Sequence, residues 1–532
     1  MSIEYISQFV FNNWKQTFDK YGCIINCTEK NIYDKYIKAL ERQDCTLQEK
    51  CNQLSNIYYE IIQRYATLYA KEELVIGLIA VKEFITKNMT KLGDRLQYID
   101  DERDCINILI WFINSLDISE FKNHCIDSVD NYISDIFIWG RLLTQLEANL
   151  ERYKIAEQKK TCLREMAFGI VEDKVFHDFY EEYERQGLYE KFEDYEIKNI
   201  NIKKQTERLN VSPTLIREDA NKIVQDSFRF CLSTLRKLSE IVGCTFFETR
   251  EDLLLYIRDD SVMCDRIGFP KNVFYTLGER VGVSQDEINT ILQVFSFENK
   301  GIREIELSCF YLSEDIVFFG PCDMLQVFGM FEKFSLSGYF LDCYKENTNF
   351  IELLNPCQKR IATYMSYVLA DVLVGEGYKM HVEKFTYNRQ VYYSPCAEIK
   401  TILNGKKNIL KDAGDIDVLF LDDYKKQVIC VEYKYFQPAI SYEQMCKSDR
   451  NKITNQVYEK NKQIQCRENI VRENIECVVE FLGGSGKKYD VKTIIVLSRP
   501  NMYVFTEESS ERIKYEIMTM NEFCDKAMLH DL

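Results

Sequence analysis

Residues 414–436 read Gly414-Asp-Ile-Asp-Val-Leu-Phe-Leu421, then Asp422-Asp-Tyr-Lys-Lys426, then Gln427-Val-Ile-Cys-Val-Glu-Tyr-Lys-Tyr-Phe436. Two apolar runs, rich in β-branched and aromatic residues, flank a short polar segment, which is the pattern of two strands joined by a turn. If Tyr424 and Lys425 form the tip, antiparallel pairing places Asp417 opposite Glu432. The stretch therefore predicts a β-hairpin in which two carboxylates face each other.

Lys434 joins these two carboxylates on one face, because residues two apart on a strand point the same way. Directly opposed side chains have Cβ atoms about 4.5–5.5 Å apart, and like charges so placed destabilise a sheet. At an effective dielectric constant near 20, two carboxylates about 5 Å apart repel by roughly 3 kcal/mol. A divalent cation bound by both would offset this repulsion, since Mg²⁺ is commonly held by one or two carboxylates together with substrate phosphate.

An ordinary salt-bridged hairpin is the alternative interpretation, because charged residues on strands usually mark a solvated face. Here, however, residues 418–421 and 428–431 are apolar without alternation, which indicates strands covered on both faces. A carboxylate inside such a strand requires a stabilising partner. We therefore favour the metal site.

The segments Gly-Asp-Ile-Asp417-Val-Leu and Val-Glu432-Tyr-Lys434 resemble the PD-(D/E)xK nuclease superfamily, the fold of many restriction enzymes and Holliday-junction resolvases. The resemblance extends over residues 350–500. It implies that Asp417 and Glu432 bind Mg²⁺, with Mn²⁺ as a substitute, and that Lys434 positions or activates the attacking water. Ile416 stands where the family has its proline.

A third acidic ligand is not assigned by the resemblance. Family members often supply an acid from the first helix, but the corresponding residues 358–360 are Gln-Lys-Arg and no carboxylate is nearby in that half of the helix. The choice therefore stays open among Glu398, Glu383 and Glu352. In the alternative interpretation each of these is a surface residue.

The helix after the hairpin is expected to supply a polar site residue. Gln456, Lys460 and Gln463 share one face of that helix by their spacing and could contact substrate phosphate or water. We predict that Gln456 is the residue that does so.

The predicted order of elements after residue 350 is that of the family core, α-β-β-β-α-β. A helix over 356–374, begun by Asn355-Pro356, is followed by a strand over 378–387, the hairpin, a helix over 450–472 and a strand over 491–498. The predicted fold class of residues 351–532 is thus a restriction-endonuclease-like α/β domain with a mixed sheet.

The chain before this region is predicted to be mainly helical, in a multidomain protein of 532 residues. We predict a helical domain over 1–199, a second helical segment over 200–300 and a short β-rich connector over 301–350. The helical pattern rests on the spacing of apolar residues and on a capping box at Ser284-Gln-Asp-Glu287. The clearest apolar stripe contains Leu54, Ile57, Ile61, Tyr65 and Leu68.

Charge is distributed unevenly along the chain. The net charge is −16, which is unfavourable for binding nucleic-acid phosphates, but from residue 351 onward 26 basic residues balance 26 acidic ones. The acidic excess therefore lies before residue 351, and local basic loops in the neutral C-terminal region can still meet phosphate. Those loops contain Lys406, Lys407, Lys411, Lys425 and Lys426.

The strongest acidic run, residues 178–196, has eight acids and two bases with interleaved aromatic residues. We interpret it as a helix with a solvated acidic face. The alternative is a strip that docks a protein partner or inhibits the nucleic-acid cleft, which would place protein partners or self-association at the acidic N-terminal region.

The remaining composition limits the classes of protein. The 20 cysteines form no Cys-x-x-Cys pair and are expected to be reduced, mostly buried thiols. Only four histidines are present, which argues against a histidine-dependent nuclease. No signal-peptide pattern or membrane-length apolar run is found, so we expect a soluble cytoplasmic protein without a membrane partner.

Together these patterns predict a Mg²⁺-dependent nuclease that hydrolyses phosphodiester bonds of nucleic acid, with DNA favoured over RNA. A role as a bacterial restriction or antiphage defence effector follows only by analogy with similar proteins. The competing hypothesis is a non-catalytic helical scaffold with a degenerate nuclease fold, which the acidic N-terminal region and the missing helix carboxylate favour.

Overall fold

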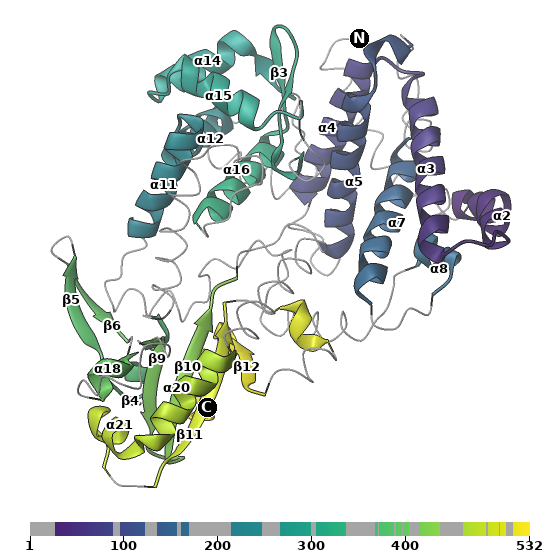
Figure 1. Ribbon diagram of the computed structural model, residues 1–532. Coiled ribbons are helices and arrows are strands. Elements are labelled where there is room, and N and C mark those ends of the chain that lie inside the picture. Colours follow the sequence, from purple (N-terminus) through teal and green to yellow (C-terminus); the bar gives the residue numbers. More distant parts are fainter. Residues whose placement is uncertain are drawn as a thin grey trace. The chain divides into compact units, whose positions relative to one another are not determined.

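The computed structural model of the chain (Figure 1) describes residues 27–88, 96–122, 136–156, 161–169, 214–246, 267–298, 300, 305–336, 366, 368–370, 372–387, 390–395, 397–403, 415–436, 461–485, 488–498, 501–506 and 514–532. The chain divides into two compact units. One contains residues 1–171, 224–333 and 341–346, and the other contains residues 172–223, 334–340 and 347–532. The predicted boundaries after residues 199, 300 and 350 stay predictions.

The described part of the chain before residue 337 is mainly helical, as predicted. Helix α3 packs against α7 and α8, and α5 packs against both α4 and α7. The short helical segments are η1 (Tyr33–Ile37), α2 (Lys38–Glu41), η4 (Ile118–Glu120), α8 (Leu163–Phe168) and η6 (Ile305–Leu307). The longer helices are α3 (Leu47–Ala66), α4 (Lys71–Asn88), α5 (Leu96–Ser115), α7 (Ile138–Ile155), α11 (Thr214–Phe228), α12 (Leu232–Phe246), α14 (Lys271–Arg280), α15 (Gln285–Val294) and α16 (Pro321–Leu336).

Helix α3 has a different buried face from the predicted one. The side chains of Leu54, Tyr58 and Ile62 are fully buried, together with those of Cys51 and Ala66. The other members of the predicted stripe are only partly buried, at positions 57, 61, 65 and 68. The helix itself is confirmed. Tyr58 takes the central position against α7, with its ring centroid 5.8 Å from that of Trp139.

Two further predictions in this region have opposite outcomes. The capping box at Ser284 is confirmed, since the Ser284 N–H donates to Glu287 Oε2 at 3.0 Å and the Glu287 N–H donates to Ser284 Oγ at 3.3 Å. The β-rich connector is wrong for residues 321–336, which form α16. Among the described residues of the connector, 305–336, the strands are β2 (Tyr311–Leu312) and β3 (Ile316–Phe318), in a small sheet of order β1-β3-β2 with β1 (Phe269–Pro270).

Helix α16 begins where the sequence indicated a break between strands. Pro321 occupies the first helical position, where its missing N–H costs nothing. The Glu83 carboxylate of α4 accepts the next two N–H groups, from Cys322 at 3.0 Å and Asp323 at 2.9 Å. Gly320 is required by this approach, because a Cβ atom there would lie 2.2 Å from Glu83 Oε2.

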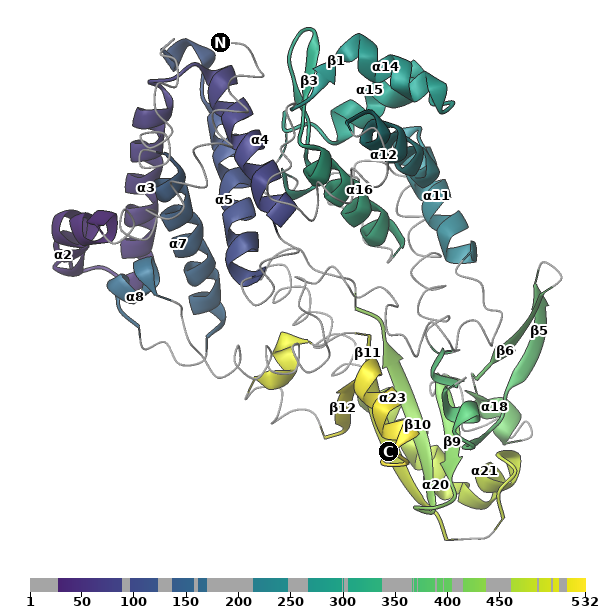
Figure 2. The ribbon, with the colours of Figure 1, turned by 180° about the vertical axis from the view of Figure 1, so that it is seen from behind.

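The second unit contains a five-stranded mixed sheet of order β12-β11-β10-β9-β4. Strands β10, β11 and β12 are parallel, whereas β9 is antiparallel to both β10 and β4. Figure 1 shows α20 and α21 in front of this sheet, and Figure 2 shows α23 on its other side. The strands are β4 (Lys379–Met380), β5 (Glu383–Tyr387), β6 (Gln390–Ser394), β7 (Ala397–Glu398), β8 (Asp415–Ile416), β9 (Val418–Asp422), β10 (Gln427–Lys434), β11 (Asp490–Leu497) and β12 (Glu516–Thr519), and the helices are α18 (Ile399–Ile402), α20 (Asn461–Glu473), α21 (Ile475–Phe481), the 3₁₀ turn η9 (Met502–Phe505) and α23 (Met520–Met528).

Both faces of the sheet are covered, which confirms the interpretation of the non-alternating apolar runs. On one face, Leu419 and Cys430 belong to a buried cluster with residues of α18, α20 and α21. On the other face, the centroid of the Phe420 ring lies 6.3 Å from that of Phe523 on α23 and 5.2 Å from that of Tyr378. Residues that alternate along β9 therefore enter two different cores.

The predicted hairpin and its register are confirmed for the paired residues. Gln427 pairs with Asp422 at the turn, and Val431 pairs with Val418 at the far end of the ladder. Asp422 fixes the turn, since its Oδ1 accepts the N–H of Tyr424 at 2.9 Å and of Lys425 at 3.0 Å. This local arrangement explains why the sequence was sufficient to place the register.

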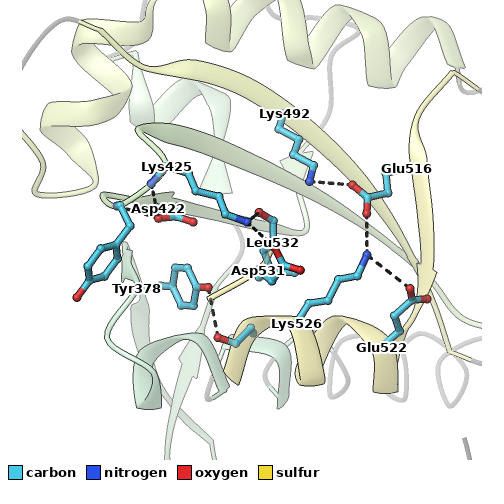
Figure 3. A network of polar contacts seen from close by, with 11 residues as sticks. Tyr378, Asp422, Lys425, Lys492, Glu516, Glu522, Lys526, Asp531 and Leu532 are labelled. Atoms are coloured by element: carbon cyan, nitrogen blue, oxygen red, sulfur yellow. Dashed lines mark hydrogen bonds and ion pairs between the residues drawn. The ribbon is translucent and has the colours of Figure 1, made fainter. Parts of the chain in front are cut away.

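The hairpin tip is attached to the C-terminal helix region (Figure 3). Lys425 Nζ donates to the carbonyl oxygen of Leu532 at 2.7 Å, and Tyr378 Oη donates to that of Ala527 at 3.3 Å. Glu516 of β12 is held between Lys492 at 2.7 Å and Lys526 at 3.0 Å. These contacts fix α23 against the face of the sheet that lies opposite α20.

The cysteines in the described ranges are free thiols, as expected, and several are exposed rather than buried. Cys27, Cys162 and Cys477 are exposed. Burial raises the pKa of the Cys430 and Cys524 thiols to about 12, so these two stay protonated and unreactive at neutral pH.

Candidate metal centre

The end of β10 holds two members of the predicted charged triad of Asp417, Glu432 and Lys434. Glu432 and Lys434 are 6% and 7% exposed, and they lie opposite Ile495 and Leu497 of β11. By the two-residue repeat of a strand they share the face of Cys430, which packs toward α20. Two charged side chains are thus placed at the edge of an apolar core.

Asp417 lies in a bend between β8 and β9, one residue before the paired part of the hairpin. Its Oδ2 accepts the backbone N–H of Tyr433 at 2.9 Å, so it lies beside the chain segment that joins Glu432 to Lys434. Burial first and the charge of Glu432 second raise the pKa of the Asp417 carboxyl to about 6, against the opposite effects of Lys434, the Tyr433 N–H and Arg467. The structure therefore brings the three predicted residues together.

Glu432 is the centre of a buried ion triad. Its Oε1 accepts from Lys434 Nζ at 2.5 Å, and its Oε2 accepts from Nη1 of Arg467 on α20. Arg467 was missed by the sequence analysis. It continues the stripe of Gln456, Lys460 and Gln463 by four more residues, so the helical spacing itself contained a signal for it.

For the other predicted site residues, the structure describes the backbone of Glu383 and Glu398 and the side chain of Gln463. Gln456 and Glu352 lie outside the described residues. Glu383 is on β5 and pairs with Ser394. Glu398 is on β7, in register with Asp415, two positions before Asp417. Gln463 of α20 is exposed.

Two carboxylates with hard oxygen donors fit Mg²⁺, which needs only one or two protein carboxylates when substrate phosphate and water complete its shell. Within the described ranges, no group of three or more His, Cys, Asp and Glu side chains is arranged to hold a metal ion. Asp417 and Glu432 are thus the residues that would hold a cation, with the open positions left to phosphate and water.

Comparisons of the sequence with protein-family models, with curated proteins and with solved structures found no match. Among the helices that the structure describes, none is both long and apolar enough to cross a membrane. The functional assignment therefore depends on the chemistry of this centre.

Proposed function

We propose that the chain is a metal-dependent nuclease that hydrolyses phosphodiester bonds of nucleic acid, with DNA as the expected substrate. The observation that carries this proposal is the convergence of Asp417, Glu432 and Lys434 at one covered end of the hairpin. The restriction-endonuclease-like identity of the mixed sheet belongs to the same proposal. A role in restriction or antiphage defence rests on the sequence resemblance alone.

The three residues have separate roles in the proposed reaction. Asp417 and Glu432 hold the cation, and a carboxyl group with a pKa of about 6 is mostly ionised at neutral pH. A bound Mg²⁺ would polarise the phosphate and lower the pKa of water at the site. The Lys434 ammonium, adjacent to Glu432, stabilises negative charge that develops on the phosphate oxygens or orients the attacking water.

The second candidate function is a scaffold in which a nuclease-like domain has lost its chemistry. The specific observation in its favour is that both oxygens of Glu432 already accept from cations of the protein, Lys434 and Arg467. A carboxylate so engaged serves as a structural ion pair without any metal. Metal binding by the purified protein separates the two functions.

The test uses purified protein on plasmid DNA, linear DNA and RNA, with Mg²⁺, Mn²⁺ or EDTA. We expect cleavage with either metal and none with EDTA. Asp417→Asn should abolish cleavage and weaken Mn²⁺ binding measured by calorimetry, because it removes one carboxylate charge from the centre.

Asp490→Asn is the matched control, since Asp490 is exposed and pairs with Gln427 at the other end of β10. This variant should cleave and bind Mn²⁺ like the wild type. Wild-type protein that neither binds Mn²⁺ nor cleaves any of the three substrates would leave the scaffold as the function.

A further inference from the structure

Arg467 is the charged group of this centre that the proposed reaction does not yet use. Its Nη1 donates to Glu432 Oε2, while Lys434 occupies Oε1 at 2.5 Å. The side chains of Arg467 and Glu432 are only 12% and 8% exposed, so the pair is largely shielded from water. The carboxylate proposed to hold a cation is therefore already neutralised by the protein.

Charge balance determines what happens to this pair when a divalent cation binds. Asp417 and Glu432 together carry two negative charges, which Lys434 and Arg467 balance. Adding a divalent cation brings like charges close together, and even unit charges about 4 Å apart repel by roughly 4 kcal/mol at an effective dielectric constant of 20. The cation and Arg467 therefore compete for Glu432.

Arg467 is better able to leave Glu432 than Lys434 is. Lys434 stands on the same strand as Glu432, two residues away, and so shares its face. Arg467 reaches the carboxylate from a separate helix through a long side chain. That helix is anchored independently, since Thr493 Oγ1 of β11 donates to Glu468 Oε2 at 3.0 Å, so the side chain can move while α20 stays in place.

A released guanidinium beside the centre has an obvious ligand in the proposed reaction. Its planar fork of N–H donors matches two oxygens of a phosphate, a geometry that a lysine ammonium lacks. With the cation bound, the four side chains and the cation sum to a positive charge of two, which favours an anionic phosphodiester at the same place.

We propose that Arg467 is a positioning residue with two alternative partners. In the metal-free protein it neutralises Glu432, and when a divalent cation replaces it there it binds a phosphate group of the nucleic acid. This inference rests on the proposed function. A purely structural ion pair between α20 and β10 is the alternative role.

The first measurement is Mn²⁺ binding by calorimetry to the full chain, without nucleic acid. Removing a competitor should tighten binding, so Arg467→Met should bind Mn²⁺ about tenfold more tightly than the wild type, a coupling of ordinary size. Arg472→Met is the control on the same helix, because Arg472 is 60% exposed and pairs with Glu468. It should leave Mn²⁺ affinity unchanged.

The second measurement is binding of a short fluorescent DNA duplex, by anisotropy, in Ca²⁺, which has the same oxygen-ligand preference. Arg467→Met should weaken this binding about tenfold. The lysine of Arg467→Lys keeps a positive charge beside Glu432 but lacks the planar fork of N–H donors. This variant should therefore also weaken DNA binding, without tightening Mn²⁺ binding. Thermal unfolding in EDTA shows whether each variant is folded. If Arg467→Met does not fold, Arg467→Lys replaces it in the DNA-binding measurement.

Three outcomes overturn the inference. In the first outcome, the wild type binds Mn²⁺ and cleaves, but the Arg467→Met variant binds DNA as the wild type does. The phosphate role of Arg467 is then wrong, while the proposed function stands. The same holds for Arg467→Lys if that variant has to replace Arg467→Met. If Arg467→Met binds Mn²⁺ more weakly or equally, Arg467 is a structural partner of Glu432. If the wild type binds no Mn²⁺, the proposed function and this inference fail together.

Discussion

Ionisation of the Asp417 carboxyl is unfavourable in the metal-free protein. The pKa of this carboxyl is raised from 3.8 to about 6, first by burial and second by Glu432. For an acid whose pKa rises on folding, ionisation opposes folding: the penalty is absent below 3.8, grows with pH and is complete above about 6. A metal ion at the centre would remove this penalty.

Asp417→Asn should therefore stabilise the metal-free protein at pH 7. The free energy of unfolding should rise by at most about 3 kcal/mol, and this gain should shrink toward zero as the pH falls to about 4. The Asn amide oxygen can still accept the Tyr433 N–H that Asp417 accepts now. Urea unfolding in EDTA at several pH values measures the effect.

The control for this prediction is again Asp490→Asn, whose exposed side chain should give a change near zero at every pH. A destabilised Asp417→Asn protein at pH 7 would contradict the prediction. It would mean that Asp417 is satisfied by its neighbours without any metal ion.

The sequence was sufficient to group Asp417, Glu432 and Lys434, because all three lie just beyond the paired end of one hairpin whose register is set by the local turn at Asp422. It was insufficient for Arg467. The rotation of α20 over β10 depends on apolar packing between elements distant in sequence, and no local pattern determines which residue of a helical stripe reaches a given carboxylate.

At the scale of elements, α4, α5 and α16 are joined by buried charges. Lys82 Nζ of α4 lies 2.9 Å from Asp323 Oδ2 of α16, and Arg103 Nη2 of α5 lies 3.2 Å from Asp323 Oδ1. Lys82 is fully buried and also donates to the Ser308 carbonyl at 3.0 Å. Asp323 is thus the shared counter-ion of two buried cations.

Asp323→Asn should destabilise the protein by about 3–5 kcal/mol, because both cations lose their charge partner inside the core. Adding Lys82→Met to this variant should recover part of the loss, since it removes one of the unpaired cations. Chemical unfolding of the single and double variants measures both effects.

Glu332→Gln provides the comparison on the same helix, because Glu332 pairs with Arg236, which is 50% exposed. It should cost less than about 1 kcal/mol. Equal costs for Asp323→Asn and Glu332→Gln would show that the buried charges do not hold α16.

Helix α16 also shows why an element can be missed in a sequence. Its start is capped by Glu83, a residue 240 positions before Asp323, so the signal that ends one strand and begins a helix is not local. The capping box at Ser284, by contrast, lies within four consecutive residues and was predicted correctly.

At the scale of the whole molecule, the proposed chemistry belongs to one of the two units. A fragment of residues 347–532 contains every strand of the five-stranded sheet and the helices α20, α21 and α23. It is a better choice than a cut near residue 304, which would carry α16 away from its partners Lys82 and Glu83.

We expect the fragment 347–532 to fold and to bind Mn²⁺ with an affinity close to that of the full chain. Circular dichroism and calorimetry check the two expectations. Introducing Asp417→Asn into the fragment is the control, and it should weaken the binding. A folded fragment that binds no Mn²⁺, when the full chain does, would place a ligand outside these residues.

The most direct test of the central claim measures Mn²⁺ binding and cleavage rate on one preparation of Lys434→Met. This change keeps similar bulk but removes the ammonium, so Mn²⁺ should still bind while cleavage falls by several orders of magnitude. Lys526→Met, on α23 at the opposite face of the sheet and with a side chain 30% exposed, should match the wild type in both measurements. Cleavage by Lys434→Met at the wild-type rate would contradict the assignment of Asp417, Glu432 and Lys434 as a catalytic centre.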